Sequence, residues 1–463
     1  MVPGLHVTMH REISGVRRLL TLRRNNRPPS GLRSGVRPPF PRLAPFAYRP
    51  HESSGPDHDR TANIVSERGR QVLHAVSTST QLLAAITWPS DVERTFFATG
   101  ALPSPRYEVN RDQAQANLTL LDEMAPELSG DAPLTVLLRR TAQSFRLSNA
   151  MLLAVGTKEF HTLSREAYGG ARTTAHGTGE TNLDFAEHLV ARLGDGNVVQ
   201  RSGKWTAEEF CRDIESRMQR RAKRPELNIE LSDELSAKAS AGTTKLRVRR
   251  DATFDPEEAR GLFCHEVETH LLTAQNGAAQ SKLPFLKNGG PRTTRTQEGL
   301  AVFSEFHAQA MTSERLLRLV NRVRLVAMAE DGADFLDLYR FLRERGHEER
   351  AAYLDASRIC RGGLVTGGAP FTKDAVYLAG FLDVYEYLRT HVSRAGENVP
   401  ALLVCGRIAL EDMPELQALA DDGTLEPPAF LPAWARRWDD LLTHFAVTSF
   451  LSDHARPGPP PAP

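Results

Sequence analysis

His265-Glu266-Val267-Glu268-Thr269-His270 is the most informative segment of this chain, and Gln297-Glu298-Gly299-Leu300-Ala301 follows it later in the sequence. Together the two segments supply two imidazoles, a carboxylate beside the first imidazole, and another carboxylate 28 residues after the second. Mononuclear zinc hydrolases use this set of ligands and base. We therefore interpret the two segments as a candidate zinc site.

The spacing of the two histidines predicts an unusual helix. In the common zincin motif the histidines stand at positions i and i+4, about 40° apart around the helix axis. Here they stand at i and i+5, which is about 140° apart and points the two rings in different directions in a regular helix. One i→i+5 bulge between Cys264 and Leu271 would return both rings to one face, and such bulges occur mostly at functional sites. We therefore predict a distorted turn in this segment.

Our preferred assignment has His265, His270 and Glu298 bind Zn²⁺ and leaves the fourth position open for water. Glu266 is then the general base. The metal lowers the pKa of the water toward about 7, and the carboxylate takes up its proton and passes it to the leaving amine. This is peptide hydrolysis without a covalent intermediate. Two other ligand pairs stay open, which are Glu266 with His270 at i,i+4 and His265 with Glu268 at i,i+3.

The second carboxylate is predicted to lie near the start of another helix. Thr294-Arg295-Thr296-Gln297 has the form of a capping box, so Glu298 would follow in the first turn, where the helix dipole favours its charge. Glu305 stands seven residues further on, within about 20° of the same face. It is therefore a candidate for holding a ligand histidine in place, with a surface or salt-bridged glutamate as the alternative.

The predicted secondary structure is dominated by helices. Alternating apolar and polar residues indicate strands over residues 227–231 and 245–250, before the motif. The helix of the histidines is predicted to begin at Pro256 and to stop at Asn276-Gly277. The fold class is therefore α+β and helix-rich, a zincin-like metallopeptidase with a small sheet before the HExxxH helix. Further helices are indicated by apolar residues at helical spacing over residues 71–86, 112–124, 132–155, 183–193, 313–328, 334–344, 374–389, 399–413 and 433–452.

The composition is that of an ordinary globular protein, with 40% hydrophobic and 25% charged residues among 463. A formal net charge of +1 gives the chain as a whole no electrostatic bias toward nucleic acid, so nucleic-acid binding is the least favoured function. Four cysteines without a CxxC pair favour reduced thiols in the cytoplasm. There is no run of 18 apolar residues and no apolar signal segment, so we expect neither a membrane span nor export.

We divide the chain into four parts. Residues 1–60 are predicted to be a disordered basic tail rich in Pro and Arg, since the first fifty contain ten Arg and the single acid Glu12. Residues 61–224 form the helical N-terminal part of the catalytic unit, and residues 225–453 form its zincin-like catalytic part. Residues 454–463 are predicted to be a disordered, proline-rich tail.

Three motifs also carry a resemblance to a known family. They are His265 to His270, the segment Gln297-Glu298-Gly299-Leu300-Ala301-Val302-Phe303-Ser304-Glu305, and Thr372-Lys373-Asp374-Ala375-Val376-Tyr377-Leu378-Ala379-Gly380. Over roughly residues 60 to 450 the chain resembles the tyrosine/phenylalanine carboxypeptidase family. That family includes the microtubule-associated tyrosine carboxypeptidases and bacterial QEGLA-motif proteins described as flavohaemoglobin expression modulators. The resemblance implies zinc bound by His265, His270 and Glu298, with Glu266 catalytic.

A carboxypeptidase acts on the C-terminus of a peptide or protein and must hold the terminal carboxylate, which calls for a cation near the metal. The candidates are Arg358, Arg361 and Lys373. Tyr377 lies four residues after Lys373 and would share its helix face, so it is a candidate for polarising the carbonyl or stacking on an aromatic side chain, with core packing as the alternative. The competing function is a non-catalytic regulatory or interaction protein that keeps zinc for folding. The oligomeric state is not indicated.

Overall fold

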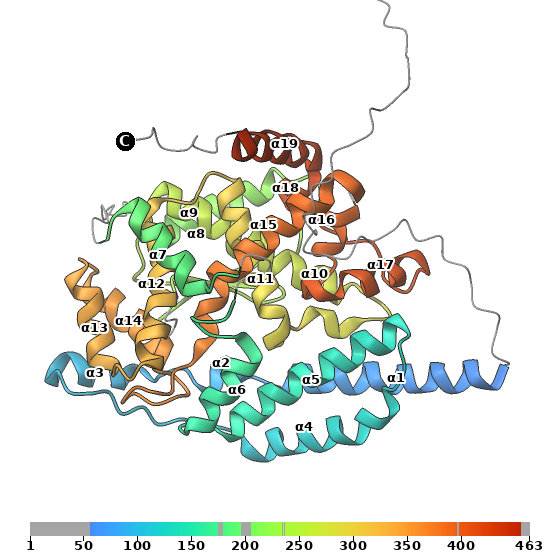
Figure 1. The fold of residues 1–463 in the computed structure, drawn as a ribbon, viewed down its shortest axis with the longest axis horizontal. Helices are drawn as coiled ribbons and strands as arrows, with labels where there is room; N and C mark the ends of the chain where they lie inside the picture. Colours follow the sequence, from blue (N-terminus) through green and yellow to red (C-terminus); the bar gives the residue numbers. More distant parts are fainter. Residues whose placement is uncertain are drawn as a thin grey trace, which may run out of the picture. The chain divides into compact units, whose positions relative to one another are not determined.

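Helices build most of this protein, and a three-stranded sheet precedes the motif segment, so the fold is α+β and helix-rich as predicted (Figure 1). The α-helices are α1 (Pro56–Ser79), α2 (Leu82–Ala85), α3 (Ser90–Thr99), α4 (Arg111–Met124), α5 (Pro133–Leu153), α6 (Lys158–Tyr168), α7 (Asn182–Leu193), α8 (Ala207–Gln219), α9 (Pro256–Leu262), α10 (Leu272–Ala278), α11 (Pro291–His307), α12 (Ser313–Glu330), α13 (Phe335–Glu344), α14 (Glu349–Cys360), α15 (Val376–Ala395), α16 (Asn398–Leu403), α17 (Met413–Asp421), α18 (Ala433–Arg436) and α19 (Trp438–His454). A π-helix, η2 (Phe263–Leu271), joins α9 to α10, and short 3₁₀ helices are η1 (Ala125–Glu127), η3 (Pro284–Lys287), η4 (Thr372–Ala375) and η5 (Leu410–Asp412).

The computed structural model describes residues 56–174, 179–195, 205–233, 235, 237–395 and 398–454. All of them belong to one compact unit, Glu52–Pro463. Of the predicted basic tail, residues 1–55 lie outside the described residues, whereas residues 56–60 are the first residues of α1. Of the predicted proline-rich tail, His454 is the last residue of α19 and the rest lies outside the described residues.

The sheet has the strand order β1-β3-β2, with β1 (Asn228–Ser232) parallel and β2 (Ala239–Ala241) antiparallel to the central β3 (Lys245–Arg249). The sequence predicted β1 and β3 but not β2, because three small residues carry no alternation of apolar and polar side chains. Leu246 and Val248 of β3 are fully buried and share a core with Val267 of η2. The sheet is therefore packed against the helix that carries the motif.

One predicted helix is wrong. Residues 399–413 were expected to form a single helix, but α16 ends at Leu403 and the chain continues as a crossing with a turn and bends before η5 and α17. Gly406 lies in this crossing, where a Cβ would be 2.8 Å from the Leu286 side chain and 3.4 Å from the Cα of Gly277. The close packing against α10 and η3 takes precedence over helix propensity here.

The helices before and after residue 225 share one core. Leu73 of α1 and Leu137 of α5 are buried in the same cluster as Leu300 of α11, Val384 of α15 and Leu441 of α19. The N-terminal helices therefore support α11 directly, and α11 carries the second carboxylate of the motif.

The closest helix crossing in this core joins α11 to α15, which lie side by side in Figure 1. A Cβ on Gly299 would overlap the backbone carbonyl of Gly380, and a Cβ on Gly380 would lie 3.2 Å from the Cα of Gly299. Two glycines thus allow the backbones to touch. The contact fixes Glu298, the neighbour of Gly299, relative to η4 and α15.

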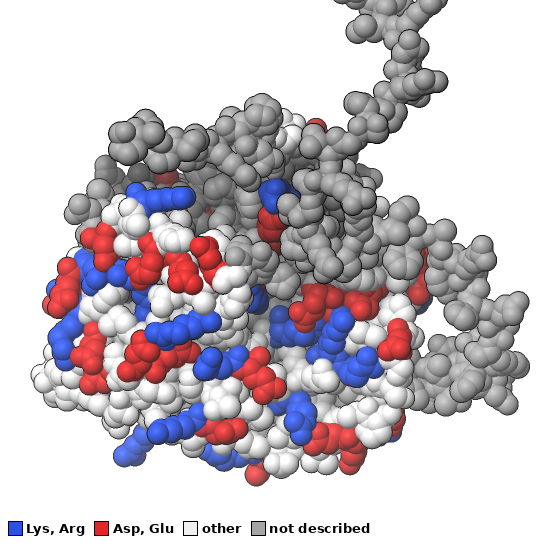
Figure 2. Space-filling view, in the orientation of Figure 1, with Lys and Arg blue, Asp and Glu red and all other residues white. Residues whose placement is uncertain are grey.

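The surface and helices of the described part show two further features. On the face in Figure 2, positive and negative side chains are interspersed, without an extended surface of one sign among the residues coloured there. Over the part of the chain that the structure describes, no helix is both long and apolar enough to cross a membrane.

Candidate metal centre

The motif helix has the predicted distortion. Asp255 caps it, since its Oδ1 accepts a hydrogen bond from the Glu258 N–H at 2.8 Å, and Pro256 occupies the first turn, where its missing N–H costs nothing. The segment Phe263–Leu271 is then π-helical. The ring centroids of His265 and His270 lie 4.8 Å apart. The wider turn therefore brings both histidines to one face, and the predicted bulge is confirmed.

The structure brings Glu298 of α11 to the same two histidines. One donor atom from each of His265, His270 and Glu298 lies within 4.8 Å of the others. Glu298 Oε2 is 3.4 Å from His265 Nε2 and 3.5 Å from His270 Nε2. Ligand atoms about 2.0–2.2 Å from one tetrahedral zinc ion stand roughly 3.3–3.6 Å apart. Oε2 is buried without a hydrogen bond, so these residues fit a metal ion that would be its missing partner.

The other oxygen of Glu298 is held by a buried lysine. Lys373 Nζ, from η4, donates to Glu298 Oε1 at 2.9 Å and lies 3.3 Å from the hydroxyl of Tyr377. Burial on its own would raise the pKa of Glu298, but Lys373 and the two histidines outweigh it and hold that pKa well below its usual range. Glu298 is therefore ionised, as a carboxylate that binds a metal must be.

His265 is oriented by Glu305, one of the residues singled out from the sequence. Its Nδ1 lies 2.7 Å from Glu305 Oε1, so its Nε2 faces Glu298. Arg315 donates to both Glu305 oxygens at 2.8 Å. Burial opposes the charge on Glu305, but Arg315 and His265 lower its pKa to about 2. Burial likewise opposes a charged His265, whereas Glu298 and Glu305 raise its pKa to about 10. Bound metal would replace that proton.

Glu266 and Glu268 have different surroundings. Glu266 Oε2 accepts a hydrogen bond from the Ala241 N–H of β2 at 2.8 Å, so the sheet holds this carboxylate beside the cluster. Glu268 is buried on another side, where it pairs with Arg221 and accepts from the Ala433 N–H at 2.7 Å. These contacts favour His265, His270 and Glu298 as the ligand set over a pair that includes Glu268.

The predicted capping box before Glu298 is wrong. Helix α11 begins at Pro291, with Gly290 as its N-cap, so Glu298 lies two turns inside the helix and not in its first turn. Thr293 Oγ1 accepts from the Gly290 N–H at 3.1 Å. The side chain of Gln297 instead accepts from Thr273 Oγ1 at 2.8 Å and ties α11 to α10. The charge of Glu298 is thus stabilised by Lys373, not by the helix dipole.

The remaining candidates lie on one side of the cluster. Arg358 donates to both oxygens of Asp374, at 2.6 and 2.9 Å, and its Nη2 is 3.3 Å from the hydroxyl of Tyr377. The ring of Tyr377 stacks at 6.5 Å on that of His265. The guanidinium of Arg361 lies 5.6 Å from the ring centre of Phe371, and burial and Arg358 lower its pKa to about 10. Arg358 and Lys373 already have anionic partners, whereas Arg361 forms no ion pair with an acid among the described residues.

Sequence reasoning missed one further cation, Arg407. Burial lowers the pKa of its guanidinium, and Glu298 and Glu266 act against that effect. Its electrostatic interaction with the candidate ligand and base had no sequence signal, because residues 399–413 were interpreted as one continuous helix.

Two histidines and a glutamate around one point, beside a further carboxylate, form the donor set of metal-dependent peptidases. The family model of the microtubule-associated tyrosine carboxypeptidases matches residues 94–453, and the chain belongs to this family. Membership supports carboxypeptidase activity on a peptide or protein.

Among solved structures, metallocarboxypeptidase 1 of Trypanosoma cruzi is similar at 13% sequence identity and a TM-score of 0.39, over 86% of this chain and 99% of that one. No curated protein matches the sequence significantly.

Proposed function

We propose that this chain is a zinc-dependent metallocarboxypeptidase that removes a single C-terminal residue, preferably an aromatic one, from a peptide or protein. The observation that carries the proposal is the buried Glu298 Oε2, which has no hydrogen bond and lies 3.4 and 3.5 Å from two imidazole nitrogens. The aromatic preference rests on the family description, which names tyrosine. We also propose the cytoplasm as its location, on the basis of the sequence alone.

In this proposal His265, His270 and Glu298 hold the ion. Zinc bound by them supplies a Lewis acid for the scissile carbonyl and for the attacking water. Glu305 accepts the Nδ1–H of His265 and so directs Nε2 toward the ion, which is the usual role of a carboxylate behind a ligand histidine. Lys373 keeps Glu298 ionised.

Glu266 is the proposed general base. Its Oε2 is fixed by the Ala241 N–H, which leaves Oε1 to take the proton from water as the carbonyl is attacked. The same carboxylate then returns the proton to the leaving amine, so that the two proton transfers balance. Tyr377, whose hydroxyl oxygen lies near Lys373 and Arg358, is a candidate for contacting the substrate through its O–H.

A non-catalytic zinc protein is the alternative function. A structural zinc site is closed by four protein ligands, whereas a catalytic site keeps one position open. Within the described ranges, the cluster that could hold a metal contains three such residues. This number favours catalysis.

The test is a comparison of matched peptides with the zinc-loaded protein. A peptide that ends in a free Tyr or Phe should lose that residue, and the same peptide with an amidated C-terminus should be cleaved much more slowly. Glu266→Gln is the control, since it should keep the zinc and lose turnover. Internal fragments, or equal cleavage of the amidated peptide, would contradict the carboxypeptidase assignment. Zinc content with no hydrolysis of any peptide would favour the non-catalytic alternative.

A further inference from the structure

The segment between α16 and η5 is attached to α10, which continues the motif helix η2, and to α11, which carries Glu298. Asn276 Nδ2, on α10, donates to the Val404 carbonyl at 2.7 Å. Thr296 Oγ1, on α11 and two residues before Glu298, accepts from the Leu410 N–H at 3.0 Å. Arg407 lies between these two attachment points. Its backbone is therefore held in a fixed position relative to both helices.

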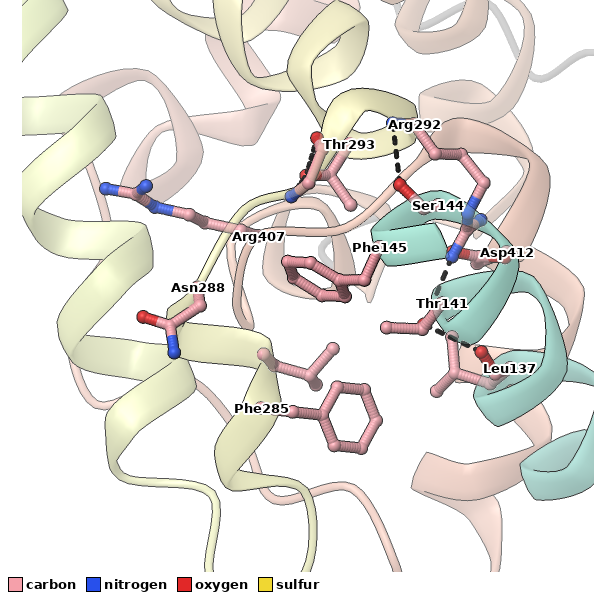
Figure 3. A pocket seen from close by; sticks show the side chains of 12 residues that line it. Leu137, Thr141, Ser144, Phe145, Phe285, Asn288, Arg292, Thr293, Arg407 and Asp412 are labelled. Atoms are coloured by element: carbon pink, nitrogen blue, oxygen red, sulfur yellow. Dashed lines mark hydrogen bonds and ion pairs between the residues drawn. The ribbon is translucent and has the colours of Figure 1, made fainter. Parts of the chain in front are cut away.

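The side chain of Arg407 is guided along a specific path. The backbone N–H of Arg407 donates a hydrogen bond to the Leu286 carbonyl at 2.8 Å. A Cβ on Gly289 would lie 3.3 Å from Cδ and 3.6 Å from Nη1 of Arg407. Because Gly289 has no side chain, the side chain of Arg407 can pass close to it. In Figure 3 the guanidinium extends away from Phe145 and Phe285, the aromatic residues of the adjoining pocket. The charged group is thus directed away from the aromatic side of this pocket.

The guanidinium has no partner in the described part of the chain. Its Nε is buried without a hydrogen bond, and no ion pair joins it to a described residue. The acids that act on it most are Glu298 and Glu266, the candidate ligand and the candidate base. A guanidinium without an ion-pair partner, whose Nε is shielded from water and whose charge interacts with the candidate ligand and the candidate base, is suited to bind an anion.

We propose that Arg407 binds the terminal carboxylate of the peptide substrate. This inference rests on the proposed function and deepens it. In a carboxypeptidase the substrate carboxylate lies one residue beyond the carbonyl that is attacked, so its cation must be near the ligands without binding them. A guanidinium can hold a carboxylate through two parallel hydrogen bonds. Lys373 and Arg358 are less suited, because Glu298 and Asp374 already occupy them.

Arg361 is the strongest competitor, because its Nε is also buried without a partner. Its closest electrostatic neighbours, however, are Arg358, Asp374, Tyr377 and Tyr168, and not the candidate base. The charge of Arg361 therefore interacts mainly with groups around Asp374, whereas the charge of Arg407 interacts with the candidate ligand Glu298 and the candidate base Glu266.

The test compares the full-length wild type with Arg407→Gln and Arg407→Lys. The readout is the ratio of kcat/KM for a peptide ending in free Phe to kcat/KM for its amide. Arg407→Gln should lose roughly 100-fold on the free acid and little on the amide, because only the acid loses a charge-assisted contact. Arg407→Lys should recover part of this loss, since it restores the charge without the two-pronged geometry. Arg292→Gln is the matched control: this arginine lines the same pocket but is paired with Asp412, and its ratio should stay at the wild-type value.

A second readout does not need turnover. In a Glu266→Gln background, calorimetry should show that the free acid binds more tightly than the amide, and that adding Arg407→Gln removes this difference. Retention of the preference in Arg407→Gln, or its loss in Arg361→Gln instead, would overturn the proposal. If the wild type cleaves neither peptide, the proposed function fails, and the binding comparison then decides on Arg407 separately. Thermal melting and zinc content of every variant identify a change that comes from misfolding.

Discussion

Lys373 and Glu298 form a buried ion pair, with Nζ 2.9 Å from Oε1, and this pair gives the two oxygens of Glu298 different partners. Oε1 binds the Lys373 ammonium group, and Oε2 faces His265 and His270. The lysine was singled out from the sequence as a candidate for the substrate carboxylate. Its position gives it another role, which is to keep Glu298 charged and oriented.

Replacing Lys373 with Met should therefore weaken zinc binding by roughly 10- to 100-fold, as expected for a residue that orients a metal ligand. The effect should depend on pH in a definite direction. Lys373 lowers the pKa of Glu298, so its removal raises that pKa, and protons compete with zinc at less acidic pH. The acidic limb of zinc affinity should move to higher pH. Titrations of zinc affinity against pH would show it, with Lys373→Arg, which keeps the charge, as the control.

Metal content tests the ligand set itself. The wild type should bind about one zinc per chain, since three protein donors and an open position complete one site. His265→Ala and His270→Ala should each lose it. Glu266→Gln should keep it while kcat falls by roughly 100- to 10,000-fold, the usual contribution of a general base. Equal zinc content in the wild type and His270→Ala, measured by elemental analysis, would contradict the assignment.

Glu305 should matter for zinc although it does not contact the ion in our proposal. Glu305→Gln keeps the size of the side chain but weakens its hold on His265 Nδ1, so zinc affinity should fall by about 10- to 100-fold. The measurement is competition with a chelator. Glu314→Gln, a carboxylate of the neighbouring helix α12 that pairs with Arg318, is the matched control and should leave the affinity unchanged.

Two helical glycines, Gly299 at the crossing of α11 and α15 and Gly261 on α9, should respond in opposite ways to replacement by alanine. Gly299→Ala places a Cβ against the carbonyl of Gly380 and should lower the free energy of unfolding by about 1–3 kcal/mol through overpacking. Gly261→Ala adds a Cβ at 3.6–3.9 Å from its neighbours, which is ordinary contact. It should raise the free energy of unfolding by up to about 1 kcal/mol, because alanine favours a helix. Denaturant unfolding of both variants checks the pair.

The local features of the site could be predicted where a short-range rule applied. The i,i+5 spacing of the histidines required a widened turn, and the π-helix Phe263–Leu271 provides it. Glu298 reaches the histidines, but not for the reason given: the capping box was wrong because Pro291 starts α11 earlier than Thr294. A threonine and a glutamine at the right spacing do not specify a cap when a proline and a glycine precede them.

Long-range packing explains what the sequence did not indicate. Strand β2 has three small residues and forms because its backbone pairs with β3 in an antiparallel arrangement. The segment that contains Arg407 is held by hydrogen bonds to α10 and α11 between residues 128 and 114 positions apart in the chain. Gly406 interrupts the expected helix because it packs on Gly277 and Leu286. None of these contacts leaves a periodic pattern in the sequence.

The partner of Glu266 is a main-chain group, the N–H of Ala241. Every amino acid except proline carries that donor. Position 241 can therefore accept many side chains during evolution while the carboxylate keeps its orientation, provided that the strand still pairs with β3. The degree of conservation at position 241 would thus underestimate the importance of its N–H group. Proline at position 241 is the one replacement that would remove the hydrogen bond to Glu266 while leaving Glu266 itself in place.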